Sequence, residues 1–472
     1  MPTAKYGYDN GNPGNFNYHN TFMKNILLLI SFLVSLFAFQ GVIHSQILTD
    51  IKINSSPNPV GSGARATGMG GAFIAVADDA TAASWNPGGL IQLETPEFSV
   101  VGACDISRDD YDSDLHPEAS GMNEVTRCDL NYFSFAFPFK VASKNMIFSL
   151  NYQKLYDLHK DMDFRIVSTG RLPGFPRYII RDKVRFRQKG SLKALSPAYA
   201  VQITPRFSVG AAFNIWTDRL FWNNDWTSKT DESFYGIGVT GNTYRNKRVR
   251  RESFSGFKGF NMNFGFLWEI NPTITIGAVC KTPFNASMKY RYHETQKVIQ
   301  PALGSILTSS IKFSEHRELK MPLSYGFGIA VRPSDVVTLS FDVYRTHWSR
   351  FFMEDENNRS TSPIDGAAKE DSHVHDTTQL RLGGEYLLML EKTIIPLRAG
   401  VFYDPQPSQK HPDDFFGFSL GSGVMLGKHI LIDWAYQVRY GHNVSGGSLG
   451  GIADAQADVI QHRMILSMIY HF

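Results

Sequence analysis

Hydrophobic and polar residues alternate along much of the chain after Pro96. In the clearest segment, residues 337–344, one parity is apolar and the other is mostly polar: Val337, Leu339, Phe341 and Val343 against Thr338, Ser340, Asp342 and Tyr344. Residues 377–388 and 430–437 alternate in a similar way. Because successive side chains of a strand point to opposite faces, each segment predicts a β-strand with one apolar face.

The last residues of the chain show the same pattern. One parity is apolar throughout, and the other is mixed: Met464, Leu466, Met468, Tyr470 and Phe472 against Arg463, Ile465, Ser467, Ile469 and His471. A continuous apolar face is typical of a membrane strand. A final strand that ends on an aromatic residue resembles the closing strand of a bacterial outer-membrane β-barrel.

About fourteen such segments follow one another, an even number that suits a closed antiparallel barrel. We therefore expect an all-β fold, a transmembrane antiparallel β-barrel. The expected strands lie near residues 97–107, 127–139, 145–168, 181–202, 206–226, 252–269, 273–292, 311–332, 336–352, 374–389, 395–403, 416–426, 429–441 and 461–472.

The connections between these segments alternate between short and long. Short turns, such as residues 271–272 and 427–428, are expected on the periplasmic side. Long polar connections at 105–126, 226–251, 293–310, 353–373 and 441–460 are expected to be extracellular loops. This alternation places both chain ends in the periplasm.

Composition agrees with a barrel and excludes some partners. Aromatic residues make up 13% of the chain, with 35 Phe and 20 Tyr, as expected for the aromatic girdles of a barrel. The mean hydropathy of -0.21 would suggest a soluble protein, but polar lumen-facing residues offset the lipid-facing ones. A net charge of +3 gives no reason to expect nucleic acid as a partner.

The first residues are expected to lie outside the mature protein. Residues 1–22 are polar and are predicted to be a non-native or disordered upstream segment. Residues 23–45 are predicted to be a signal peptide, because Lys24 precedes an apolar run and Ser45 is small enough for cleavage. The alternative is a transmembrane anchor, for which the run is short.

Residues 46–95 precede the predicted barrel, which covers residues 96–472. The part from Gly61 to Leu90 is rich in Ala and Gly and cannot form lipid-facing strands. We expect it inside the barrel or in the periplasm. Gly68–Gly71 lacks the strand and the lysine of a phosphate loop. The adjacent carboxylates Asp78 and Asp79 fit helix capping better than metal or acid–base chemistry.

Three motifs in this segment resemble the FadL/TodX family of outer-membrane transporters for long-chain fatty acids and aromatic hydrocarbons. They are Gly70-Gly71-Ala72, Asp78-Asp79-Ala80 and Trp85-Asn86-Pro87-Gly88, the last with Gly88 where the family usually has Ala. Weaker similarity continues through residues 277–283, 319–333, 342–351 and 397–404, so the resemblance runs from about Gly61 to Phe472.

The resemblance implies a fourteen-stranded barrel whose lumen is plugged by an N-terminal hatch formed by residues 46–95. Apolar cargo would pass the hatch and leave sideways through the wall at a kinked strand. The residues carried over are the turn Asn86, Pro87 and Gly88 as a gating element, and Gly70, Gly71, Asp78 and Asp79 as its packing. The alternative for Asn86-Pro87-Gly88 is a plain turn that ends a helix.

Parity predicts a polar set on the lumen side: Asp342, Arg381, Glu385, Asp433, Arg439 and Arg463. Charges of both signs can brace a plug by mutual pairing or can line a solute path. Ligand contacts cannot be assigned. Parity also places Cys104 on the lipid face and Cys128 on the lumen face, so we expect no bridge between them.

The function expected is passive outer-membrane transport of hydrophobic small molecules by a monomer that contacts outer-membrane lipids and the barrel-assembly machinery. The alternative is a scaffold or shuttle for protein secretion. No cofactor, metal or catalytic site is predicted. His347 and Ser349 share a parity as in barrel lipases but lack an orienting group, and His373 and His375 lack further metal ligands.

Overall fold

The computed structural model describes residues 61–171, 177–218, 220–237, 242–301, 304–391, 393–408, 411–445 and 455–472. The predicted upstream segment, the predicted signal peptide and residues 46–60 of the predicted hatch lie outside these ranges. No helix within them is long and apolar enough to cross a membrane.

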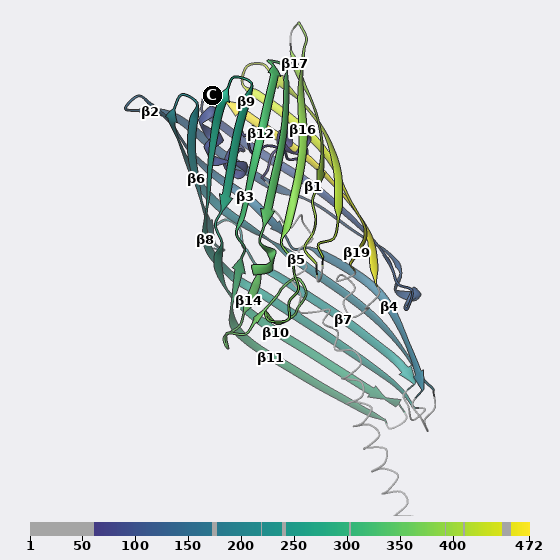
Figure 1. Ribbon diagram of the computed structural model, residues 1–472. Helices are drawn as coiled ribbons and strands as arrows, with labels where there is room; N and C mark the ends of the chain where they lie inside the picture. The colour runs from purple at the N-terminus through teal and green to yellow at the C-terminus, as the bar shows by residue number, and fades with distance from the viewer. Residues whose placement is uncertain are drawn as a thin grey trace, which may run out of the picture.

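The fold is a closed barrel of fourteen antiparallel strands (Figure 1), which confirms the predicted fold class. Each strand pairs with the next around the ring, and β20 closes it against β1 with Glu97 opposite His471. The barrel strands are β1 (Glu97–Asp112), β2 (Gly121–Val141), β3 (Lys144–Asp157), β5 (Arg177–Thr204), β6 (Phe207–Trp216), β8 (Thr243–Asn271), β9 (Ile274–Lys281), β12 (Ser324–Ser334), β13 (Val337–Thr346), β16 (Thr377–Met389), β17 (Ile394–Tyr403), β18 (Phe415–Leu426), β19 (Ile430–Ser445) and β20 (Gln456–His471).

The two faces of the strands differ as the alternation predicts. On β13, Leu339 is 50% exposed on the outer wall, whereas the neighbouring Ser340 is 2% exposed. On β20, Leu466 is 58% exposed, and Ile465 is 4% exposed. The outer wall therefore presents apolar side chains to lipid, and the inner wall is covered by other parts of the chain.

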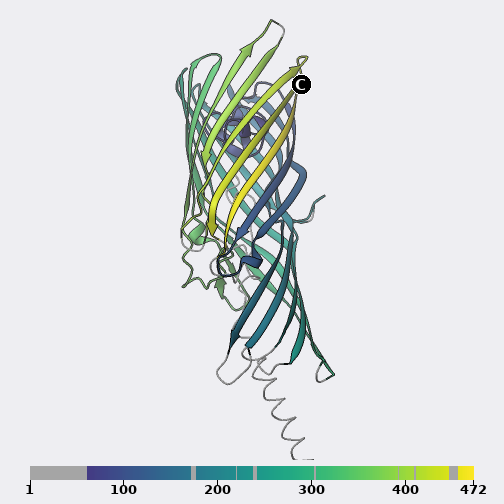
Figure 2. The same ribbon diagram turned by 90° about the vertical axis from the view of Figure 1, so that its right-hand side faces the viewer.

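Six neighbouring strands continue past one end of the barrel as a second sheet, here called the extension (Figures 1 and 2). It contains the N-terminal parts of β5 and β8 between four further strands, in the order β4-β5-β7-β8-β10-β11. These four are β4 (Lys160–Arg171), β7 (Trp226–Ile237), β10 (Phe284–Gln300) and β11 (Ser305–Met321).

The extension corrects two loop predictions. Residues 226–251 and 293–310, expected as long loops, form mostly hydrogen-bonded strands. Here many exposed positions carry charged side chains, such as Arg185 and Lys247, so a continuous apolar outer face no longer marks the strands. The short turns lie at the opposite end, beside the C-terminus (Figure 1).

Residues 61–95, here called the inner segment, lie against the inner wall. They form two short helices, α2 (Ala64–Gly68) and α3 (Ala82–Trp85), and the 3₁₀ helix η2 (Pro87–Gln92). Helix α2 contacts β17 to β20, and η2 contacts β3, β5, β6 and β8. The remaining short elements lie in connections: η3 (Pro117–Ala119), η5 (Trp348–Arg350), β14 (Phe352–Glu354) and β15 (Ser360–Thr361).

Cys104 and Cys128 form a disulfide, which corrects the prediction that they do not bridge. They lie directly opposite each other on β1 and β2. The parity argument failed because Val101 pairs with Tyr132 while the next residue pairs with Leu130. The extra residue, Asn131, is a β-bulge that reverses the facing of β2 beyond it.

Candidate functional site

The backbone of the inner segment packs directly against the backbone of the barrel wall. Gly383 and Gly400 lie opposite each other on β16 and β17. A Cβ added at Gly383 would lie 2.0 Å from the Met69 carbonyl oxygen, and one at Gly400 would lie 2.3 Å from the Gly70 nitrogen. Gly70 and Gly71, predicted as packing residues, have φ of 68° and 74° and make the tight turn at this contact.

Two predicted lumen residues hold this turn through backbone groups. The Asp342 carboxylate accepts hydrogen bonds from the Phe73 nitrogen at 2.6 Å and the Ile74 nitrogen at 2.8 Å. The Arg381 guanidinium donates to the Gly70 carbonyl at 2.9 Å. One oxygen of this buried carboxylate therefore receives both backbone N–H groups, whereas its other oxygen has no hydrogen-bond partner among the described residues.

A chain of ion pairs joins the inner segment to three wall strands. Arg65 of α2 binds Asp78 at 2.6 Å and Glu385 at 2.9 Å. Glu385 binds Arg398 at 2.6 Å, and Arg398 binds Asp433 at 2.5 Å. Arg65 and Arg398 were not among the predicted residues, although parity places Arg398 on the inner wall.

The other two predicted lumen residues bind elsewhere. Arg439 and Arg381 share Asp404, each at 3.4 Å. Arg463 of β20 binds Asp105 of β1 at 2.7 Å and so ties the closing strands together. These two arginines therefore brace the wall.

The Asn86-Pro87-Gly88 turn is fixed to the wall at β8. The Asn86 side-chain amide donates to the Ile74 carbonyl at 2.9 Å and to the Phe266 carbonyl at 2.8 Å. Its oxygen accepts from the Gly88 nitrogen at 3.0 Å, and Pro87 begins η2. A Cβ on Gly88 would lie 2.8 Å from the Phe266 Cα, so the small residue allows this close approach.

Asp78 and Asp79 have separate partners. Asp78 binds Arg65, as described above, and also lies 3.7 Å from Arg332. Asp79 accepts from the Thr81 nitrogen at 2.7 Å and from its hydroxyl at 2.6 Å, which turns the chain into α3. Burial raises the pKa of the Asp79 carboxyl, and the nearby Arg65 opposes this shift.

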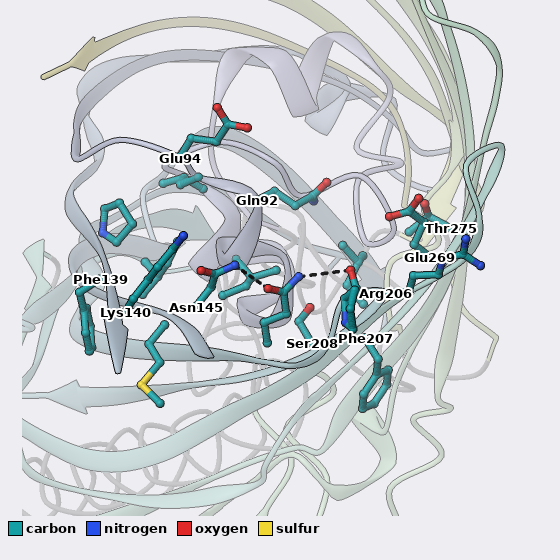
Figure 3. Close-up of a pocket in the computed structure, with 18 of the residues that line it drawn as sticks. Gln92, Glu94, Phe139, Lys140, Asn145, Arg206, Phe207, Ser208, Glu269 and Thr275 are labelled. Carbon is teal, nitrogen blue, oxygen red and sulfur yellow. Dashed lines mark hydrogen bonds between the residues drawn. The ribbon is translucent and has the colours of Figure 1, made fainter. Parts of the chain in front are cut away.

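A cavity of about 550 Å³ lies beneath the inner segment at the end of the short turns (Figure 3). Its lining is rich in polar and charged groups: Gln92, Glu94, Lys140, Asn145, Gln202, Arg206, Glu269 and Arg332. Figure 3 shows Asn145, Arg206 and Glu269 around one space. Such a lining suits water better than hydrocarbon.

An apolar cluster lies on the inner side where the barrel meets the extension. Its rings come from both parts: Trp226 stacks on Phe254 with centroids 4.4 Å apart, and Trp216 stacks on Phe284 at 5.4 Å. We call it the aromatic cluster; its buried members are Tyr156, Leu158, Leu192, Ala194, Trp216, Trp226, Phe254, Phe257, Ala286, Met288, Tyr290, Leu319, Met321, Trp348, Phe351, Met353 and Val374. No local pattern in the sequence indicates this cluster, because its members are spread over many strands.

The wall between β2 and β3 changes beside this cluster. Ladder pairing between the two strands runs from Val141 opposite Lys144 to Tyr132 opposite Gln153, and within the described residues it stops there. Beyond that point β2 pairs with β1, and β3 pairs with β5. We call this unpaired stretch the seam.

Side chains cross the seam in place of backbone hydrogen bonds. Lys154 binds Asp129, and Arg127 binds Asp157. A small cavity of about 20 Å³ lies there, lined among others by Ala103, Lys154 and Tyr156. Tyr156 also belongs to the aromatic cluster, so the cluster and the seam are continuous.

Asp376 is an acidic partner of His347 and Ser349 that the sequence did not indicate, but within the described residues these two side chains do not bind each other. His347 and Ser349 each bind Asp376, at 2.8 Å and 2.7 Å. His375 stacks on His411 at 5.6 Å. In the described part of the chain, no three His, Cys, Asp or Glu side chains come together as ligands of a metal ion would.

A closed antiparallel barrel with apolar side chains on its outer wall is the architecture of an outer-membrane protein. Residues 60–453 match the family model described as outer membrane protein transport protein (OMPP1/FadL/TodX). The chain therefore belongs to this family, is a multi-pass barrel of the cell outer membrane, and is a transport protein rather than an enzyme.

Solved structures show the same fold at low sequence identity. A Pseudomonas aeruginosa FadL homologue matches with a TM-score of 0.59 and 13% identity over 88% of this chain and 99% of that one. The Pseudomonas putida toluene transporter TodX gives 0.54 and 13% over 88% and 99%. The CymD monoaromatic hydrocarbon channel gives 0.52 and 16% over 88% and 98%. Among curated proteins, no sequence matches significantly.

Proposed function

We propose that the protein passively transports hydrophobic compounds, such as long-chain fatty acids or aromatic hydrocarbons, across the outer membrane. The observation that carries this proposal is the aromatic cluster, which holds more aromatic side chains than any other buried apolar cluster of the described residues. It gains support from family membership and from the names of the similar channels, which carry toluene and monoaromatic hydrocarbons.

The cargo would bind first at the aromatic cluster. Each methylene that leaves water gains about 0.8 kcal/mol, so a chain of several carbons binds such a surface without charged contacts. Aromatic side chains offer large apolar area with few rotatable bonds. Apolar cargo would bind poorly in the polar cavity next to the inner segment, so this cavity is not a suitable exit for it.

The cargo would then leave sideways through the seam into the outer leaflet. Tyr156 joins the cluster to the seam, and only side chains close the wall there. Rotation of Lys154 and Arg127 would open it without breaking ladder hydrogen bonds. A lateral exit spares apolar cargo from entering the periplasmic water.

The inner segment would act as the hatch that keeps water and solutes from passing along the barrel. Asn86, Pro87 and Gly88 would set its position relative to β8, while Gly70, Gly71, Asp78 and Asp79 pack it. The wall charges Asp342, Arg381, Glu385 and Asp433 would hold it in place. We also propose that the barrel-assembly machinery inserts the chain, that its outer wall contacts membrane lipids and that it works as a monomer.

The test is uptake of radiolabelled oleate and toluene by cells with and without the gene. We expect faster initial uptake of at least one apolar compound when the gene is present. Equal uptake of every apolar compound, together with loss of a secreted protein from the medium, would favour the secretion scaffold.

The gating role is tested separately with the variant Asn86→Ala/Pro87→Ala. We expect a folded, heat-resistant barrel with reduced uptake, because Asn86 loses its hydrogen bond to Phe266 of the wall and its hydrogen bond to Ile74 within the inner segment. Failure of the variant to fold would assign the turn a structural role only.

A further inference from the structure

The outer face of the extension is strongly basic. Odd-numbered residues of β5 point outward here and carry five cations in succession, with no acid among them: Arg181, Lys183, Arg185, Arg187 and Lys189. The even-numbered residues of the same stretch are buried on the inner face, among them Val184 and Phe186. The positive charge is therefore confined to one face of the sheet.

Cations also lie opposite one another across neighbouring strands. Arg187 of β5 is opposite Lys229 of β7, and Lys229 is opposite Arg251 of β8. Four residues from Arg251 along β8, Lys247 is opposite Lys297 of β10. Like charges directly opposite each other destabilise a sheet. These cation pairs therefore lower the stability of the extension unless an anion lies between or beside them.

Acidic neighbours offset only part of this charge. Asp161 lies 3.5 Å from Arg187, and Asp231 lies 2.6 Å from Lys229. Lys247 and Lys297 have no ion pair within the described residues. This face therefore favours binding of an anionic partner from outside the chain.

The position of the basic face identifies that partner as a lipid. On β8, the exposed residues Phe264 and Phe260 belong to the lipid-facing band, and the exposed Lys258 follows directly on the same face. Lys289 of β10 lies diagonally across from Lys258, because Lys258 is opposite Ser287. The charges thus begin where the apolar band ends, at the level of lipid headgroups.

We propose that the outer face of the extension binds the phosphate groups of outer-leaflet glycolipids, with Lys258 and Lys289 at the edge that adjoins the barrel. Lipid chains would pack on Phe260 and Phe264, while Lys and Arg side chains pair with phosphates. A soluble polyanion would gain nothing from the neighbouring apolar band. The proposal concerns lipid anchoring and does not depend on the cargo.

Among the described residues at the end of β1 and β20 away from the short turns, no run of exposed cations occurs. The exposed Arg108 pairs with Glu124 at 2.6 Å, and the acidic residues Asp110 and Asp458 lie nearby. The binding surface should therefore lie on one side only, which would fix the rotation of the barrel relative to its lipid neighbours.

The test uses the full-length protein purified in non-ionic detergent. The probes are rough-type lipopolysaccharide and the same glycolipid after chemical removal of its phosphates. The variant is Lys258→Gln/Lys289→Gln, and its matched control is Lys144→Gln/Lys428→Gln, which removes two exposed charges from the short turns at the other end.

We expect the parent protein and the control to bind the phosphorylated glycolipid equally. The Lys258→Gln/Lys289→Gln variant should bind about tenfold or more weakly, since each cation near an anionic lipid surface contributes measurably. Removal of the phosphates should weaken binding to the parent protein by a similar factor. Unchanged stability against urea would show that the variant is folded.

Equal binding by the parent protein and the variant would overturn the proposal, and so would equal binding of the two glycolipids. Binding of a soluble polyanion such as heparin without binding of the glycolipid would also overturn it. Hydrocarbon uptake is measured independently, so failure here leaves the transport proposal untouched.

Discussion

At Gly400 the backbone of β17 directly contacts the backbone of the inner segment. A methyl group added at this position should therefore push the two apart. The added Cβ of Gly400→Ala would lie 2.3 Å from the Gly70 nitrogen and 2.4 Å from the Met69 carbonyl carbon. Neither atom can rotate away, so the inner segment must move, at a cost of about 1–3 kcal/mol. We expect a folded barrel that leaks small hydrophilic antibiotics, measured as increased drug sensitivity.

The matched control is Gly102→Ala, because a Cβ at Gly102 meets no atom within 4 Å. Cells with this variant should keep the parent sensitivity. An unchanged sensitivity for Gly400→Ala would contradict the view that the inner segment closes the lumen.

Sequence analysis could find residues whose role is local and could not find distant pairs. Asn86 and Pro87 stand out because amide and proline at that spacing mark a turn in any context. Arg65 was missed because its partner Glu385 is 320 positions away, and nothing near Arg65 indicates it. The disulfide was misjudged because one bulged residue, Asn131, reverses the parity of the strand beyond it.

The sequence predicts a strand well where the outer face of that strand has to be apolar. Lipid imposes that requirement on the barrel, and the alternation of strands such as β13 and β20 follows from it. The extension stands outside the apolar band, where water accepts charged side chains. The sequence therefore predicts a loop where β7 and the N-terminal part of β8 lie.

The inner face of the extension should respond to pH. Burial raises the pKa of Asp182 on β5 to about 7, and the nearby charge of Glu232 on β7 adds to the shift. Burial raises the pKa of Glu232 as well. Because the folded pKa of Asp182 lies above the unfolded value of about 4, its protonated form stabilises the sheet at low pH, and this stability is lost as the pH rises towards about 7.

We expect the amides of β5 and β7 in the extension to be better protected from hydrogen exchange at pH 5 than at pH 8, after correction for intrinsic rates. Asp182→Asn should reduce this pH dependence, and the part that remains would come from Glu232. Asp163→Asn, which changes an exposed carboxylate on β4, should leave the pH dependence intact. An unchanged pH dependence in Asp182→Asn would contradict this assignment.

At the scale of the whole molecule, three places have different chemistry. The aromatic cluster lies on the inner side of the barrel, the seam lies in its wall, and the polar cavity lies at the end with the short turns. On the proposed route, the inner segment would separate the apolar cluster from the polar cavity. Transport by this route would need movement at the seam, while the ion pairs that hold the inner segment could remain closed.

This division predicts that the seam can be blocked without disturbing the rest of the molecule. Ala103 is buried on β1 and lines the small cavity beside Lys154 and Tyr156. The indole of Ala103→Trp exceeds a cavity of about 20 Å³, so it should project into the seam between β2 and β3. We expect uptake of apolar cargo to fall severalfold, while fluorescence quenching of the tryptophans by bound cargo persists.

Ala278→Trp is the matched control, because Ala278 lies on β9 opposite the lipid-facing Phe327 and its indole would enter the bilayer. Its uptake should equal that of the parent protein. If Ala103→Trp transports at the parent rate, cargo does not leave through the seam, and the polar cavity beneath the inner segment becomes the remaining exit. A loss of both binding and uptake would instead show that the substitution disturbs the aromatic cluster through Tyr156.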